Sequence, residues 1–372
     1  MKLTKISFSS TLKTLHGVMA LLITALAVHS NVALAEQSSN LFSITPYATA
    51  PAIPGFPEGV AVHGNRIFVS GPARFGTAGT GPSAIQVYDR NTAEWIQTIE
   101  VTGEDLSQEH ALSNVAVDAE GRIYALSTQL GLIRFQKQGH EYVQQAYGDP
   151  LPDLPCTDQT NAVCPPPGVV IPPIANDIVF DAEGNAYVTD SLQQTIFRYA
   201  PGGGAPHMWF QSPLFEGSGF FPFGLNGIRL DPMRQYLYFA VSTTANPAVG
   251  KIYRLPLVES PDNSNLEQFH VYAASELPDQ LAFGANGKLY VSLALSNQIS
   301  VLNEDGTESM RISSMPGDAI PLDNPAGIAF DSTSKSLLIV NHALLSGNPA
   351  HFAVLKLYDG DPGNPLEKPF LP

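Results

Sequence analysis

Six oxygen-bearing side chains recur along this chain of 372 residues, one in each copy of a repeated strand motif. They are Glu58, Asn114, Asn176, Asn226, Asp279 and Asn324. If the repeat brings them around one axis, two carboxylates and several amide oxygens suit a hard divalent cation, Ca²⁺ above all. The absence of His and Cys from these positions argues against zinc or copper. A structural role is equally open, in which these residues cap strand starts or line a water-filled channel.

The elements that must position these residues are short strands joined by tight turns. Each copy runs from the polar residue through a small apolar strand and a Gly turn into a second strand rich in Tyr and Val. Turn sequences such as 119–122 and 182–185 place Gly where a positive φ is required. Six such copies without intervening helices predict an all-β, six-bladed β-propeller, because radial repetition leaves only protected sheet edges.

Ring closure requires the two ends of the propeller to pair. The segment Leu41–Ala48 precedes the first copy and has the pattern of a strand. We expect it to complete the sixth blade beside Phe352–Tyr358. In a propeller the innermost strand of each blade lines the central channel, so the six polar residues are predicted to form a ring there.

Four short motifs resemble the senescence marker protein and gluconolactonase family, which comprises six-bladed, calcium-dependent lactonase and phosphotriesterase propellers. They are Pro57-Glu58-Gly59, Ala175-Asn176-Asp177, Leu225-Asn226-Gly227-Ile228 and Leu277-Pro278-Asp279, and the resemblance extends from about Phe56 to His342. It implies that Glu58, Asn176, Asn226 and Asp279 hold a catalytic divalent cation. A carboxylate beside the cation and a water is placed for proton transfer, so Asp279 is the predicted general base or nucleophile.

Further residues are predicted to contact the substrate. Asn114 and Asn324 complete the ring, and His342 ends a strand of the sixth blade, where plain structural packing is the alternative role. The segment Pro201–Phe223 is rich in aromatic residues, among them Trp209 and Phe221. An aromatic rim would favour an apolar or aromatic lactone or ester over a bare sugar acid; the alternative is that these rings pack the loop onto the blades.

The N-terminal residues Met1–Ala35 have the features of a signal peptide: three lysines, an apolar run too short to cross a bilayer, and Ala33-Leu34-Ala35. Residues 36–372 are then predicted to form one domain in the periplasm or outside the cell. In such an oxidising compartment, Cys156 and Cys164 are expected to form a disulfide that pins a proline-rich loop.

The formal charge of −15 disfavours nucleic acid and anionic membrane surfaces as partners. The sequence therefore predicts a secreted or periplasmic, metal-dependent hydrolase of small lactones or related esters. The alternative is a non-catalytic propeller of the NHL type that binds a protein, peptide or glycan on its top face. Such a scaffold has no need for an acid at both the first and the fifth blade.

Overall fold

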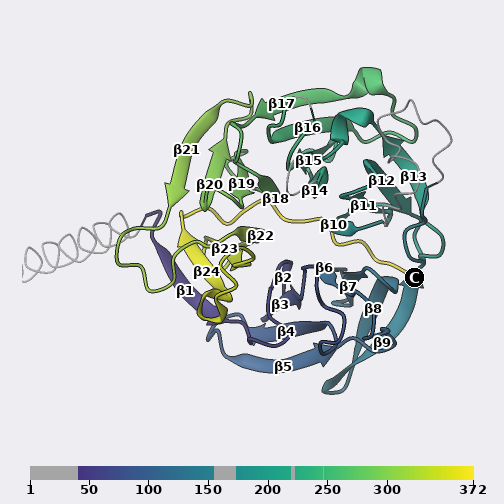
Figure 1. The fold of residues 1–372 in the computed structure, drawn as a ribbon, viewed down its shortest axis with the longest axis vertical. Helices are drawn as coiled ribbons and strands as arrows, with labels where there is room; N and C mark the ends of the chain where they lie inside the picture. The colour runs from purple at the N-terminus through teal and green to yellow at the C-terminus, as the bar shows by residue number, and fades with distance from the viewer. Residues whose placement is uncertain (1–40, 155–172, 219–222, 246) are drawn as a thin grey trace, which may run out of the picture. The chain divides into compact units, whose positions relative to one another are not determined.

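The computed structural model describes residues 41–154, 173–218, 223–245 and 247–372. Within the compact unit Ile44–Pro372, six four-stranded antiparallel sheets surround a common axis (Figure 1). The prediction of an all-β, six-bladed propeller is confirmed. The expected signal peptide Met1–Ala35 and the expected Cys156–Cys164 disulfide lie outside the described residues. Within the described residues, no helix has the length and hydropathy that a membrane crossing requires.

Every blade has the same strand order from the axis outward. The innermost strands are β2 (Val60–His63), β6 (Leu112–Val117), β10 (Ala175–Phe180), β14 (Leu225–Leu230), β18 (Pro278–Phe283) and β22 (Pro325–Asp331). The second strands are β3 (Arg66–Gly71), β7 (Ile123–Ser127), β11 (Ala186–Asp190), β15 (Tyr236–Val241), β19 (Leu289–Leu293) and β23 (Ser336–Asn341). The third strands are β4 (Ala84–Asp89), β8 (Gly131–Gln138), β12 (Thr195–Tyr199), β16 (Lys251–Pro256), β20 (Gln298–Leu302) and β24 (Ala353–Tyr358). The outer strands are β5 (Trp95–Glu100), β9 (Glu141–Gly148), β13 (His207–Gln211), β17 (Glu267–Val271), β21 (Glu308–Ser313) and β1 (Ile44–Thr49). Short 3₁₀ turns occupy Pro213–Phe215, Asn263–Asn265 and Pro349–His351.

The ring is closed by the pairing that the sequence predicted. Strand β1 lies antiparallel to β24, with Ile44 opposite Leu357 and Thr49 opposite Ala353. The first strand of the described chain thus becomes the outer strand of the sixth blade. Because this pairing joins the two ends of the propeller by backbone hydrogen bonds, the sixth blade cannot open without breaking a ladder.

A β-bulge recurs at the start of five inner strands. The register of the inner strand against its neighbour shifts between Leu112 and Val115 in blade 2, and the equivalent shift appears in blades 3 to 6. A bulge inserts an extra residue and re-aims the side chains on either side of it. Two successive residues of each inner strand are therefore turned toward the axis and form two layers. In chain order, and taking the matching positions of blade 1, the upper layer is Glu58, Ser113, Asn176, Asn226, Asp279 and Ala326, and the lower layer is Gly59, Asn114, Asp177, Gly227, Gln280 and Gly327.

Buried hydroxyl groups hold the bulges against the preceding blade. The Thr189 Oγ1 donates to the Asn226 carbonyl at 2.6 Å, and the Ser292 Oγ donates to the Ala326 carbonyl at 2.6 Å. The Ser70 Oγ similarly reaches the Ser113 carbonyl at 3.3 Å. Bulge carbonyls have lost their ladder partners, so a hydroxyl group from the neighbouring blade satisfies a group that would otherwise be buried unpaired.

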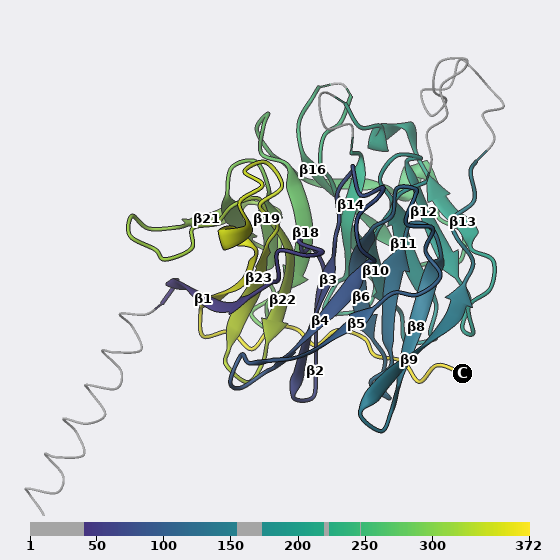
Figure 2. The same cartoon turned by 60° about the horizontal axis from the view of Figure 1, so that its bottom comes forward.

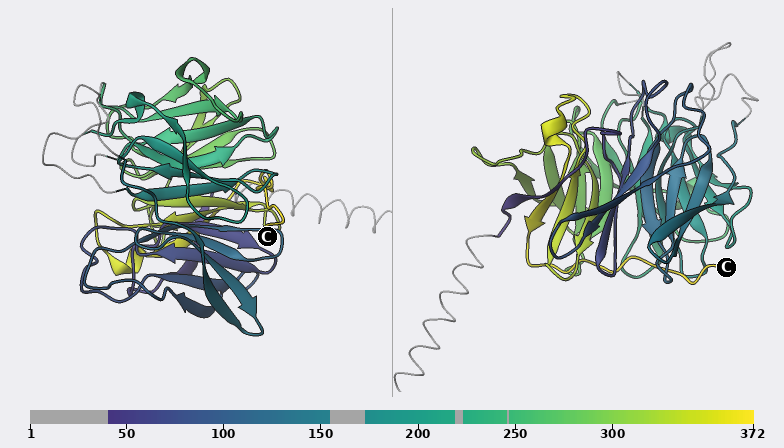
Figure 3. Two further views of the ribbon diagram at one scale, coloured as in Figure 1. Left: turned by 90° about the vertical axis from the view of Figure 1, so that its right-hand side faces the viewer. Right: turned by 90° about the horizontal axis from the view of Figure 1, so that it is seen from below.

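Residues 359–372 lie across the face that carries the turns between the first and second strands of the blades (Figures 2 and 3). This C-terminal strap contacts five blades. The Asp361 carboxylate accepts from the amides of 285 and 286 in blade 5, and Arg234 of blade 4 binds Glu367 and the Pro365 carbonyl. Lys368 donates to the Val62 carbonyl of blade 1, Arg122 of blade 2 donates to the Leu371 carbonyl, and the Leu371 side chain packs in a core with Val188 of blade 3. The strap therefore covers the end of the channel opposite the bulges.

Candidate functional site

A cavity of about 640 Å³ lies on the axis at the bulged ends of the inner strands. Five of the six upper-layer residues line it: Glu58, Ser113, Asn176, Asn226 and Asp279. Two further expected site residues, Asn324 and His342, also lie on its wall. The structure thus brings all four predicted metal ligands to one cavity, each from a different blade.

Three of these side chains carry a buried oxygen that accepts no hydrogen bond within the described residues. They are the Oδ1 atoms of Asn176, Asn226 and Asp279. An amide or carboxylate oxygen left unpaired in the interior costs about 1–3 kcal/mol, so a buried cluster of them indicates a missing partner. Oxygen atoms alone, from two acids and two amides, are what Ca²⁺ or another hard divalent cation takes as ligands. The residues present therefore fit a divalent cation.

The acid content of the site is low for a metal centre. In the described part of the chain, no three His, Cys, Asp or Glu side chains converge as a metal-binding group. The four predicted ligands are two carboxylates, Glu58 and Asp279, and two neutral amides, Asn176 and Asn226. The two negative charges would balance those of a divalent cation.

The electrostatics of the cavity favour a cation as well. Burial, then the carboxylates of Asp279 and Asp177, raises the pKa of Glu58 well above 4.5. Burial, then Asp177, raises the pKa of Asp279 to about 7, against the opposing effect of a hydrogen bond from Asn226. Facing carboxylates in a desolvated cavity hold protons because ionising both is unfavourable. A cation placed between them would remove that penalty.

The orientation of Asn226 is set by its neighbour. Its Nδ2 donates to the Ser242 Oγ at 3.0 Å, and that hydroxyl in turn donates to the Pro278 carbonyl at 2.9 Å. With the amide nitrogen engaged, the Oδ1 of Asn226 is the atom left free in the cavity. The same chain of bonds ties the backbone just before Asp279 to the ligand of the preceding blade.

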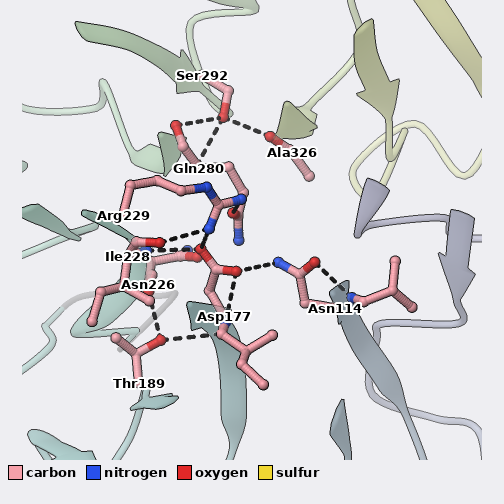
Figure 4. Close-up of polar contacts among 11 residues, drawn as sticks. Asn114, Asp177, Thr189, Asn226, Ile228, Arg229, Gln280, Ser292 and Ala326 are labelled. Carbon is pink, nitrogen blue, oxygen red and sulfur yellow. Dashed lines mark hydrogen bonds and ion pairs between the residues drawn. The ribbon is translucent and has the colours of Figure 1, made fainter. Parts of the chain in front are cut away.

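The lower layer forms a floor beneath the site, built around Asp177 (Figure 4). Its carboxylate accepts hydrogen bonds from Asn114 Nδ2 at 2.5 Å and from the Ile228 amide at 2.7 Å, and it pairs with Arg229 Nη1 at 2.5 Å. Arg229 also reaches Gln280 Oε1 at 3.3 Å. Glycine in this layer lets the inner strands of neighbouring blades approach each other closely: a Cβ on Gly227 would overlap the Asp279 carbonyl. The channel is therefore filled by a buried ion pair below the cavity.

The bulge register corrects two predicted ring positions. Asn114 aligns with Asp177 in the lower layer and is absent from the cavity lining, because Ser113 occupies the upper position of blade 2. In blade 6 the upper position belongs to Ala326, and Asn324 precedes the strand.

Unlike the four proposed ligands, Asn324 has both of its polar atoms engaged: Nδ2 donates to the Ala294 carbonyl at 2.9 Å and Oδ1 accepts from the Leu345 amide at 2.8 Å. Asn114, predicted to contact substrate from the ring, lies outside the cavity lining and hydrogen-bonds to Asp177 instead. Asn324 lines the cavity but serves to join backbone segments.

The predicted aromatic rim is also corrected. Trp209 lies on outer strand β13, within the core between blades 3 and 4, where it packs edge-on against Tyr187 and donates its Nε1 to the Val258 carbonyl at 3.0 Å. Strand β13 is irregular at this point, and both Trp209 and the adjacent Phe210 are buried. Phe221 lies outside the described residues. Phe223, from the same segment, does line the cavity and stacks on Phe75, with ring centroids 6.0 Å apart.

His342 lies on the cavity wall with its Nε2 unpaired among the described residues. Burial lowers its pKa to about 4, against a hydrogen bond to the Ala73 backbone and the charge of Asp323. The ring is therefore neutral near pH 7, and its free nitrogen is available to a bound molecule. The contact of His342 with substrate stays a prediction.

Sequence reasoning did not single out several polar residues that line the cavity, among them Arg74 and Glu109. Arg74 and Glu109 come from loops that carry no repeated pattern, so no sequence signal singled them out. His110 also lines the cavity, where it is buried with both ring nitrogens 3.0 Å from backbone carbonyl oxygens.

Comparison with known proteins gives information through the fold alone. No model of a protein family matches the sequence, and no curated protein sequence is significantly similar to it. Among solved structures, regucalcin from Agrobacterium tumefaciens, described as a calcium-binding protein, superposes with a TM-score of 0.57 at 15% identity, covering 88% of this chain and 99% of its own. A gluconolactonase from Xanthomonas campestris gives 0.53 at 14% identity, covering 85% and 88%.

Virginiamycin B lyase from Staphylococcus aureus is similar as well, with a TM-score of 0.50 at 13% identity over 81% of this chain and 94% of its own. The fold is therefore shared by proteins with different reactions, and the choice among them has to come from the site. The structural neighbours of this chain are gluconolactonase-like and regucalcin-like six-bladed propellers, which confirms the resemblance in fold.

Proposed function

We propose that this protein is a divalent-cation-dependent hydrolase of lactones or related esters, with Ca²⁺ as the preferred cation. One observation carries the proposal: three buried oxygens from separate blades, on Asn176, Asn226 and Asp279, have no partner among the described residues and line a single cavity with Glu58. The similarity to gluconolactonase and to calcium-binding regucalcin supports the same reading. We further propose, from the N-terminal sequence, that the protein acts in the periplasm or outside the cell.

The ligands would be Glu58, Asn176, Asn226 and Asp279. When bound there, a divalent cation would polarise the carbonyl oxygen of an ester and lower the pKa of water nearby. The two carboxylates offset its charge, and the amides add neutral oxygen ligands.

The catalytic steps fall to the chain's own residues. Within the described residues, one carboxylate oxygen of Asp279 has no partner and the side chain interacts with Asn226, so Asp279 can accept a proton while held in place. Water adds to the acyl carbon as Asp279 takes its proton, and cleavage of the ester C–O bond returns a proton to the departing oxygen. Neutral His342 offers Nε2 as an acceptor for a hydroxyl group of substrate or product.

The test is activity after removal and return of the cation. The chain stripped with a chelator should hydrolyse neither lactones nor aryl esters, and Ca²⁺ should restore hydrolysis more fully than Mg²⁺, Mn²⁺ or Zn²⁺. Asp279→Asn should abolish turnover. Glu259→Gln, which changes an exposed acid outside the cavity lining, should not. Ca²⁺ binding without any hydrolysis would instead favour the binding-scaffold alternative.

A further inference from the structure

Arg74 differs from the other cavity residues because its positive charge has no ion-pair partner among the described residues. Among the described residues it is the one arginine or lysine that lines the cavity. Its Nε is buried without a hydrogen-bond partner, and no described acid forms an ion pair with it. A guanidinium group has five donors in a planar fork that matches a carboxylate, so a free one in a cavity points to an anionic ligand.

The side chain is held in position by packing. The Arg74 guanidinium lies over the Phe56 ring, 4.5 Å from its centroid. Phe56 in turn packs on Phe352 at 4.9 Å and meets the His342 ring edge-on at 6.2 Å. A cation–π contact of this kind orients the guanidinium and uses its face. Its edge, which carries the N–H donors, is left for a ligand.

One acid of the cavity wall that could pair with Arg74 already accepts other hydrogen bonds. Glu109 also lines the cavity, but its Oε2 accepts hydrogen bonds from the Gly76 amide at 2.8 Å and from the Thr77 amide and hydroxyl at 3.0 and 3.1 Å. The other acids of the cavity, Glu58 and Asp279, are the proposed cation ligands. Arg74 is therefore the group in this cavity that would bind the negatively charged part of a substrate.

The rest of the cavity is mainly apolar. Blades 5 and 6 contribute Leu277, Leu295, Leu344 and Leu345, and Phe75 and Phe223 stack with an interplanar angle of 7°. An aliphatic body of several carbons fits such walls, and burying it supplies most of the binding free energy. A sugar lactone, which is polar on every side, would leave these surfaces unmatched.

We propose that the substrates of this site are amphipathic carboxylates: esters or lactones whose apolar body packs on the leucine and phenylalanine walls and whose carboxylate pairs with Arg74. This inference rests on the proposed hydrolase function and specifies its substrate class. The reacting carbonyl would lie toward the ligands Glu58 and Asp279, and the anionic end toward Arg74.

The experiment compares two matched esters on the Ca²⁺-loaded full chain. The mono-4-nitrophenyl ester of adipic acid carries a carboxylate where 4-nitrophenyl hexanoate carries a methyl group. Wild type should favour the first in kcat/KM, and Arg74→Met should lower that preference by roughly 10- to 100-fold, the usual effect of losing a charge-assisted hydrogen bond. Arg198→Met, which removes an arginine paired with exposed Glu259, should leave the preference unchanged.

A second measurement keeps the inference separate from catalysis. Calorimetric binding of hexanoate should weaken by a similar factor in Arg74→Met and be unaffected in Arg198→Met. If wild type hydrolyses both esters with equal kcat/KM, or if Arg74→Met lowers both alike, the assignment of Arg74 is overturned and the hydrolase stands. If neither ester is hydrolysed, the hydrolase proposal fails. In that case Arg74 as an anion site is upheld by weakened hexanoate binding in the variant, and is refuted by unchanged binding.

Discussion

Replacing Asp279 with asparagine tests the proposed cation site without relying on turnover. In the cation-free protein, burial and Asp177 raise the pKa of Asp279 from 3.8 to about 7. Between those values the folded protein holds a proton that the unfolded chain has released. Stability therefore falls as pH rises through this window, by about 1.4 kcal/mol per pH unit for one fully titrating group.

The expected size of the effect follows from the width of the window. A shift of about three pH units corresponds to at most about 4 kcal/mol of unfolding free energy lost between pH 4 and pH 7. Asparagine has the same shape and no charge, so the cation-free Asp279→Asn protein should lose much less over this range. The raised pKa of Glu58 acts in the same direction, and it is partly caused by Asp279, so the variant also relieves Glu58.

The assay is urea unfolding of wild type and Asp279→Asn at pH 5 and pH 7.5, each with chelator and with saturating Ca²⁺. Wild type at pH 7.5 should gain about 3 kcal/mol at a Ca²⁺ concentration 100 times its Kd. The variant should gain clearly less, because a carboxylate ligand is lost. Glu259→Gln controls for the removal of an exposed acid.

Two results would refute this reasoning. Equal pH dependence of wild type and Asp279→Asn in chelator would mean that the carboxylate of Asp279 is not desolvated beside Asp177. Equal stabilisation of the two proteins by Ca²⁺ would mean that Asp279 is not a ligand, even if the cation binds elsewhere in the cavity.

Three other substitutions probe how the fold supports the site. Arg229→Met should lower the unfolding free energy by about 3–5 kcal/mol, because Asp177 is left as an uncompensated buried charge, and Asp177→Asn added to it should recover part of the loss in urea titrations. Trp209→Ala should cost about 3–5 kcal/mol of stability while KM stays within twofold of wild type; a large KM change at normal stability would restore the rim role. Leu371→Ala should destabilise the protein by about 2 kcal/mol in the same titrations, since this strap side chain is buried against blade 3, and an unchanged midpoint would show that the strap is not docked in solution.

Residue type alone predicted the cavity residues that also occupy equivalent backbone positions in their blades. Glu58, Asn176, Asn226 and Asp279 follow one motif, and all four occupy equivalent upper-layer positions. Asn114 was matched by type as well, but a bulge has two axis-facing positions. Only backbone register shows that Asn114 belongs to the lower one.

Other features depended on contacts between segments distant in the sequence. Among the described residues no acid forms an ion pair with Arg74, and Trp209 is buried because it packs in a core formed with residues of the next blade. The ion pair of Asp177 with Arg229 joins residues 52 positions apart. These contacts leave no pattern in the local sequence, since each depends on which blades face one another.

By itself, the repeated hairpin determined the number of blades and four oxygen-bearing positions at the channel, and the strand pattern of Leu41–Ala48 predicted the closing strand, because periodicity and residue type are properties of short segments. The tertiary structure decided which ring oxygens are free. Bulge register and the hydrogen bonds between blades engage Asn114 and Asn324, and they leave the Oδ1 atoms of Asn176, Asn226 and Asp279 without a partner in the described part of the chain. The physical reason is that satisfying a buried polar atom requires a partner from another part of the chain, and only the assembled ring shows where that partner is missing.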